Sequence, residues 1–157
     1  MRFLVGLGLV GVLAWCAWWA VGSFGMQQAV SAWLEDRRAE GWQAEVSAND
    51  VGGFPADLQI TLRDLALADP DTGVAVQLDP LVIAASPLWP GDVTVRLPDT
   101  AIEFAAPDAK SALIMENGAM SMQLQPGRAL VVQQLSWTSD AWELRDPDVP
   151  FLSAASL

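Results

Sequence analysis

The sequence of 157 residues carries 8 basic and 19 acidic side chains, which gives a formal net charge of −11 at pH 7. This length suits a short accessory segment and one domain, and so acidic a chain repels phosphate backbones, which argues against nucleic acid as a partner. Histidine is absent and Cys16 is the one cysteine, so the commonest general base, the commonest metal ligand and any intramolecular disulfide are excluded.

The first predicted element is an apolar helix near the N-terminus. Residues 3–24 contain no charged side chain, and as a helix they would span about 33 Å, against roughly 30 Å for the hydrocarbon core of a bilayer. Tryptophan is favoured at the membrane interface, and several tryptophans lie in the second half of this run. We predict a transmembrane signal-anchor over residues 1–25. Its anchoring residues are Phe3, Trp15, Trp18, Trp19 and Phe24.

Two alternatives for this segment stay open. A cleaved signal peptide has a shorter apolar region of about 7–15 residues before a small-x-small site, and residues 20–22 are a passable site of that kind. A lipoprotein signal has small residues before its cysteine, whereas the bulky Trp15 precedes Cys16. The uncleaved anchor fits the length of the run best.

The charges that flank the helix predict its orientation. Arg2 and the terminal amine lie on the short side, whereas the next basic residues are Arg37 and Arg38, beside acidic neighbours. The positive-inside rule then places the N-terminus in the cytoplasm. We therefore expect a single-pass protein of the inner (cytoplasmic) membrane with its C-terminal domain in the periplasm.

Residues 26–41 are predicted to form a helical stalk that can continue directly from the anchor. Ala29, Val30, Trp33 and Leu34 recur at helical spacing. Gly41 is suited to end the helix, because glycine is common just after the last helical turn. The apolar stripe of the stalk is expected to dock onto the domain that follows.

From residue 42 onward the pattern changes to a period of two, which is typical of half-buried strands. Proline, glycine and asparagine turns separate the strands. We predict a mainly β domain over residues 42–157, in which short antiparallel strands form a curved, meander-like sheet; with the helix, the fold class is α+β. We expect this domain to be truncated at its C-terminus. One apolar face of such a sheet needs a second sheet, a helix or a ligand as cover. The alternating segments are 58–63, 74–78, 93–97, 102–104, 113–115, 120–124, 130–137 and 142–145.

One short motif carries a resemblance to a known family. A helix that ends in Gly41-Trp42, followed by Gly53-Phe54-Pro55 and an alternating strand, resembles the bacterial membrane-anchored envelope proteins catalogued as domain of unknown function 2125. An arginine often found two places after the motif is replaced here by Asp57. The resemblance implies an N-terminal membrane segment and a β-rich domain, and it implies no activity. A more distant likeness is to AsmA-type envelope proteins, which pair an anchor with a lipid-handling β groove.

The motif residues Gly41, Trp42, Gly53, Phe54 and Pro55 are expected to be structural. Residues 69–73 begin like a calcium loop but lack its bidentate glutamate, and neither a nucleophile elbow nor a phosphate-binding loop is present. We therefore predict no catalytic, cofactor-binding or metal-binding residues and a protein that is not an enzyme.

The predicted function is binding of a lipid or another apolar ligand through a face of the β-sheet. The alternative is a structural or scaffolding partner in an envelope protein complex. A hydrolase that uses acidic residues is a third hypothesis, although the scattered carboxylates single out no pair. Trp89, Trp137 and Trp142 either pack the domain or line an apolar ligand. The expected partners are thus the membrane, an apolar ligand or an envelope protein.

Overall fold

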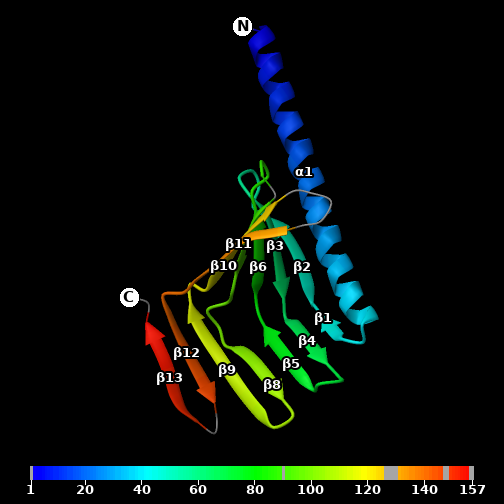
Figure 1. Cartoon of the computed structure of the whole chain (residues 1–157). Helices are drawn as coiled ribbons and strands as arrows, with labels where there is room; N and C mark the ends of the chain where they lie inside the picture. Colours follow the sequence, from blue (N-terminus) through cyan, green and yellow to red (C-terminus); the bar gives the residue numbers. More distant parts are fainter. Residues whose placement is uncertain (1, 90, 126–130, 147–148, 156–157) are drawn as a thin grey trace.

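The computed structural model describes residues 2–89, 91–125, 131–146 and 149–155. Within these ranges one long helix leads into thirteen β-strands. Figure 1 shows the helix, with the N-terminus at its free end, extending far beyond the strands. The predicted α+β class, with a helix followed by antiparallel β structure, is confirmed. Of the predicted strands, residue 130 lies outside the described residues.

Helix α1 (Arg2–Ala39) runs through both the predicted anchor and most of the predicted stalk as one element of 38 residues. It is long and apolar enough to cross a membrane once, and at about 1.5 Å per residue it spans roughly 57 Å. Gly41 adopts φ +95° and the N–H of Trp42 donates to the Arg37 carbonyl over 3.0 Å, which ends the helix as a glycine C-cap does.

The strands form two antiparallel sheets, which we name the upper and the lower sheet after their places in Figure 1. The upper sheet has six strands in the order β11 (Val131–Thr138), β10 (Ala119–Gln125), β7 (Asp92–Arg96), β6 (Leu81–Ala85), β3 (Leu58–Arg63) and β2 (Ala48–Gly52). The lower sheet has seven in the order β1 (Gln43–Glu45), β4 (Leu65–Asp69), β5 (Val74–Leu78), β8 (Ile102–Ala106), β9 (Ala109–Glu116), β12 (Ala141–Asp146) and β13 (Val149–Ala155).

The chain passes from one sheet to the other at a row of breaks, because each long strand of the meander is interrupted near its middle. Asp64 separates β3 from β4 and Asn117 precedes β10, with φ angles of +49° and +51°. Aspartate and asparagine are among the non-glycine residues that visit this left-handed region most readily. The strand direction therefore turns at these residues, and one meander builds both sheets.

Polar side chains join these breaks into a continuous seam across the molecule. The Ser47 hydroxyl donates to the Asp64 carboxylate over 2.6 Å, and the Asp64 N–H donates to Asp79 over 3.1 Å. Further along, the Asn117 N–H donates to Asp99 over 3.0 Å and its amide donates to Asp140 over 2.8 Å. Two of these bonds satisfy the backbone N–H groups of Asp64 and Asn117 at the breaks.

The core lies where α1 packs on strands β1, β2 and β3. Leu58, Ile60 and Leu62 of β3 are all buried, whereas the intervening Gln59 and Thr61 are half-buried and Arg63 is exposed. Leu34 of α1 belongs to the same buried cluster, which confirms that the stalk docks onto the domain. Burying each of these leucine side chains stabilises the fold by about 1.5–3 kcal/mol.

We expect Asn117→Val to lower the stability of the domain by about 2 kcal/mol, because a β-branched residue at positive φ is strained and the Asp140 carboxylate loses the amide donor. Asn117→Gly keeps the backbone angle and should cost less than half as much. Thermal unfolding followed by circular dichroism in detergent measures both variants. Equal losses for valine and glycine would contradict a role for the backbone angle.

Candidate functional site

An apolar groove of about 870 Å³ runs between α1 and the upper sheet. None of the residues that line it carries a charged side chain. The helix contributes Trp18, Val21, Gly22, Gly25, Met26, Ala29, Val30 and Trp33. The strands and their connections contribute Leu58, Leu62, Leu65, Leu81, Ile83, Ala85, Pro87, Val93, Val95 and Met122.

The sheet side of the groove is apolar because the register of the strands places apolar side chains next to one another on one face of the sheet. Ile60 lies opposite Ile83, which lies opposite Val95, so one apolar row crosses β3, β6 and β7. Val95 in turn lies opposite Met120 of β10, which lies opposite Trp137 of β11. Successive strand residues point to opposite faces, and Thr94 and Ser121 therefore lie together on the other, polar face.

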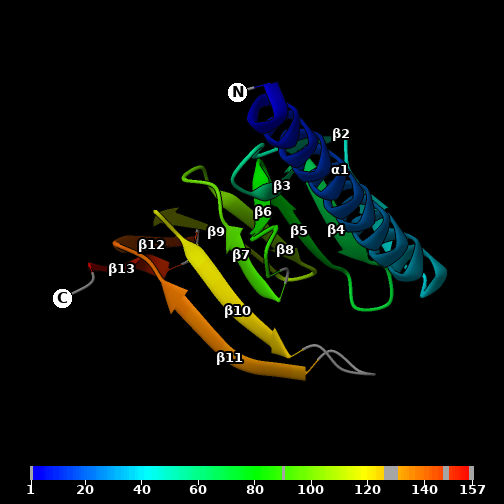
Figure 2. The ribbon, with the colours of Figure 1, turned by 90° about the horizontal axis from the view of Figure 1, so that it is seen from above.

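The apolar face is wider than the helix that covers it. Six strands span about 24 Å between the outermost chains, whereas a helix with its side chains is roughly 10–12 Å across. Figure 2 shows α1 over the side of β2 and β3, with β10 and β11 away from it. Consequently Leu135 and Trp137 on β11 remain 60% and 53% exposed. Neighbouring exposed apolar side chains of this kind are a candidate binding surface.

Two glycines shape the helix side of the groove in different ways. A Cβ at Gly22 would lie 2.9 Å from Leu58 Cδ1, so this glycine lets α1 approach β3 closely. A Cβ at Gly25 would meet no atom within 4 Å, although Gly25 also lines the groove. Open space therefore begins about one helical turn beyond the close contact.

Three of the predicted anchor residues hold the domain against the helix. The indole N–H groups of Trp15, Trp18 and Trp19 donate to backbone carbonyls of two loops, between β2 and β3 and between β6 and β7. The acceptors and distances are Pro55 at 3.2 Å, Pro87 at 2.8 Å and Asp57 at 2.8 Å, respectively. Sequence reasoning assigned these tryptophans to the membrane interface and missed the bonds, which depend on contacts between residues 38 to 69 positions apart.

The predicted family motif supplies one of these loops. Gly53 has φ +90°, and a Cβ there would lie 2.5 Å from the carbonyl oxygen of Asp57. Only glycine fits so tight a turn. The Phe54 ring packs edge-on against Trp19 with 5.2 Å between ring centroids. Gly41 and Trp42 lie far away, at the other end of α1, so the motif comprises two separate structural points. The remaining anchor residues include Phe24, exposed on α1, and Phe3, whose side chain lies outside the described residues.

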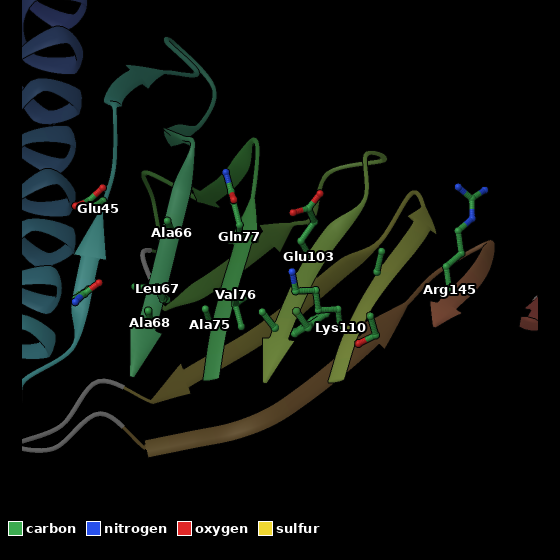
Figure 3. Close-up of a pocket in the computed structure, with 15 residues that line it drawn as sticks. Glu45, Ala66, Leu67, Ala68, Ala75, Val76, Gln77, Glu103, Lys110 and Arg145 are labelled. Carbon is green, nitrogen blue, oxygen red and sulfur yellow. The ribbon is translucent and has the colours of Figure 1, made fainter. Parts of the chain in front are cut away.

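A second, shallower pocket of about 710 Å³ lies on the lower sheet (Figure 3). Small side chains form its floor, chiefly Ala66, Ala68, Ala75, Ala105 and Ala112. Charged side chains of both signs stand among them: Glu45, Glu103, Lys110 and Arg145. Arg145 donates to Glu143 over 3.0 Å and lowers the pKa of that carboxyl through the hydrogen bond. Within the described residues no three histidine, cysteine or acidic side chains gather as a metal site would require.

The predicted turn at residues 69–73 is closed by its own first carboxylate. Asp69 accepts from the N–H of Asp71 over 3.0 Å and from the Thr72 hydroxyl over 2.7 Å. These two bonds lower the pKa of Asp69, the Thr72 hydroxyl contributing most. Both carboxylate oxygens of Asp69 therefore accept hydrogen bonds within the β4–β5 turn.

Comparison with known proteins connects the chain to a bacterial family. The family model described as "Uncharacterized protein conserved in bacteria (DUF2125)" matches residues 19–157. No curated protein and no solved structure matches the chain.

We expect Trp18→Phe to loosen the connection between β6 and β7, because the Pro87 carbonyl loses its donor. The loss should be about 1 kcal/mol of stability and faster proteolysis near residue 87. Trp142→Phe, on the distant strand β12, is the matched control for removing one indole. Unchanged proteolysis in Trp18→Phe would mean that the indole does not secure the loop.

The pKa of Asp69 should lie below its ordinary value of 3.8. A lowered folded-state pKa stabilises the fold above the unfolded value, and this contribution is lost as pH falls through the folded value. Carboxyl NMR titration of the full chain in detergent measures it, and Thr72→Val should raise the Asp69 pKa. A pKa that the valine variant leaves unchanged would contradict the assignment to the hydroxyl.

Proposed function

The chain belongs to the DUF2125 family of uncharacterised bacterial proteins, and we propose that it is a non-enzymatic membrane protein that receives acyl chains of membrane lipids in its groove. In this proposal α1 anchors the chain in the inner membrane and the strands lie in the periplasm. The observation that carries the proposal is that one helix provides both the apolar membrane segment and a wall of the uncharged groove.

The path from a bilayer into the groove is apolar along its whole length. Trp18, Val21 and Gly22 belong to the apolar run and also line the groove. A hydrocarbon chain that follows α1 out of the membrane therefore meets no charged side chain among the lining residues. The volume of about 870 Å³ falls within the range of about 300–1,000 Å³ that is typical of small-molecule sites.

The free energy of transfer favours the exchange of lipid between membrane and groove over its long-term storage in the groove. Moving a methylene group from water into an apolar site is worth about 0.8 kcal/mol, but an acyl chain in a bilayer has already left the water. Transfer between membrane and groove is then close to neutral, so lipid enters and leaves readily. This balance suits a protein that presents or passes on lipid.

The scaffold alternative rests on the same uncovered face. Leu135 and Trp137 on the edge strand β11 would also contact an apolar surface of another envelope protein. The two proposals differ in what lies against the groove side of β10, and covalent capture distinguishes lipid from protein there.

The test places the photoreactive residue benzoylphenylalanine at Met122, which lines the groove from β10. Illumination of cells that express the full chain should yield an adduct with the mass of a membrane lipid. Ser121 is the matched control, because it is the half-buried neighbour on the opposite face. A protein adduct in place of lipid at Met122, or equal lipid capture at both positions, would refute lipid binding in the groove.

The substitution Gly25→Phe is designed to block the groove without lowering the stability of the fold. A Cβ at this position meets no atom within 4 Å, and replacing a helical glycine favours the helix by a few tenths of a kcal/mol. Lipid capture at residue 122 should fall severalfold in this variant. Gln28→Phe adds the same ring to α1 at a position that does not line the groove and should leave capture unchanged.

A further inference from the structure

The uncharged part of α1 between Arg2 and the first bond to a loop is too short to cross the hydrocarbon core of a bilayer. The first loop contact along the helix is the bond from Trp15 to Pro55. From Arg2 to Trp15 the helix rises about 20 Å, whereas the hydrocarbon core is about 30 Å thick. If the charged Arg2 lies at one boundary of the hydrocarbon, the helix reaches the far boundary near Gly22.

We propose that the two loops held by the tryptophans, residues 53–57 and 86–89, enter the leaflet on the domain side of the membrane. Their contacts with α1 lie at Trp15, Trp18 and Trp19. At 1.5 Å per residue, these levels lie about 5–10 Å inside the boundary near Gly22. The partner of this surface is therefore the lipid bilayer itself.

The exposed side chains of the two loops agree with an apolar surrounding. Phe54 is 53% exposed, Leu88 is 75% exposed and Trp89 is 50% exposed. The loops that carry them, between β2 and β3 and between β6 and β7, lie at the end of the upper sheet at which α1 leaves the domain (Figure 1). The two segments contain one ionisable side chain, Asp57, which is exposed, and its charge is best placed toward the headgroups.

The indole hydrogen bonds provide an independent argument for the same depth. Backbone carbonyls that face hydrocarbon need partners within the protein, because no water is available there. The carbonyls of Pro55, Asp57 and Pro87 each accept an indole N–H from α1. In water these carbonyls would need no such donor, whereas within a leaflet each bond removes a large desolvation cost.

This inference concerns the loops and does not depend on lipid entering the groove. If both proposals hold, the groove opens within the leaflet, because Trp18 and Pro87 line its membrane end. A lipid would then reach the groove without crossing the headgroup layer.

Spin-label depth measurement tests the proposal on the full chain in phosphatidylcholine vesicles. The background variant is Cys16→Ala, and single labels are placed by Leu88→Cys, Leu9→Cys and Val74→Cys. Oxygen partitions into hydrocarbon, whereas a nickel chelate present on both sides of the bilayer stays in water. The readout is independent of the direction in which the chain inserts.

We expect oxygen to relax the Leu88 label severalfold more than the chelate does. The ratio of these two effects should lie between the ratio for the deep Leu9 label and the ratio for the Val74 label. Val74 is the matched control, because it is 41% exposed at the opposite end of the domain. A Leu88 label that is as accessible to the chelate as the Val74 label would overturn the proposal. A Leu9 label in water would overturn it as well, because α1 would then not cross the bilayer.

Discussion

The upper sheet presents an apolar face that is wider than one helix, and most features of the molecule follow from that mismatch. Alternating residues on β3, β6, β7 and β10 bring apolar side chains to one side, while α1 covers only the side of β2 and β3. The buried cluster around Ile60 and Leu34 forms where the helix lies. The groove opens beside the helix, which forms one of its walls, and the exposed Trp137 lies on β11, farther from the helix. A single helix thus supplies enough cover for a stable core and leaves the remainder open.

The helix meets two kinds of surroundings along its length. Its first half is exposed and apolar, whereas Leu34 in its second half is buried against strands. The tryptophans lie at the transition and combine an apolar ring with one N–H donor, which is why they suit both surroundings. Their bonds to loop carbonyls connect the anchor to the domain at the level where the groove begins.

Sequence patterns predicted the elements better than their arrangement. The period of two in Leu58, Ile60 and Leu62 identified β3 and its buried face, and Gly41 marked the end of the helix. The division into two sheets was not foreseen, because it depends on Asp64 and Asn117 adopting positive φ within runs that read as ordinary strands and turns. The groove was foreseen only as an apolar face in need of cover. Its position depends on strand pairing between distant residues, which alternation within one strand does not encode.

The unbroken course of α1 has a mechanical consequence. From Arg2 to Ala39 the helix has no interruption, and the indole bonds and the Leu34 contacts fix the domain along the helix from Trp15 to Leu34. A helix in a bilayer tilts to match the local hydrocarbon thickness. Because the helix has no hinge, the strand domain rotates with it. A thinner membrane therefore tilts the domain toward the membrane surface. The helix then acts as a rigid lever that converts bilayer thickness into domain orientation.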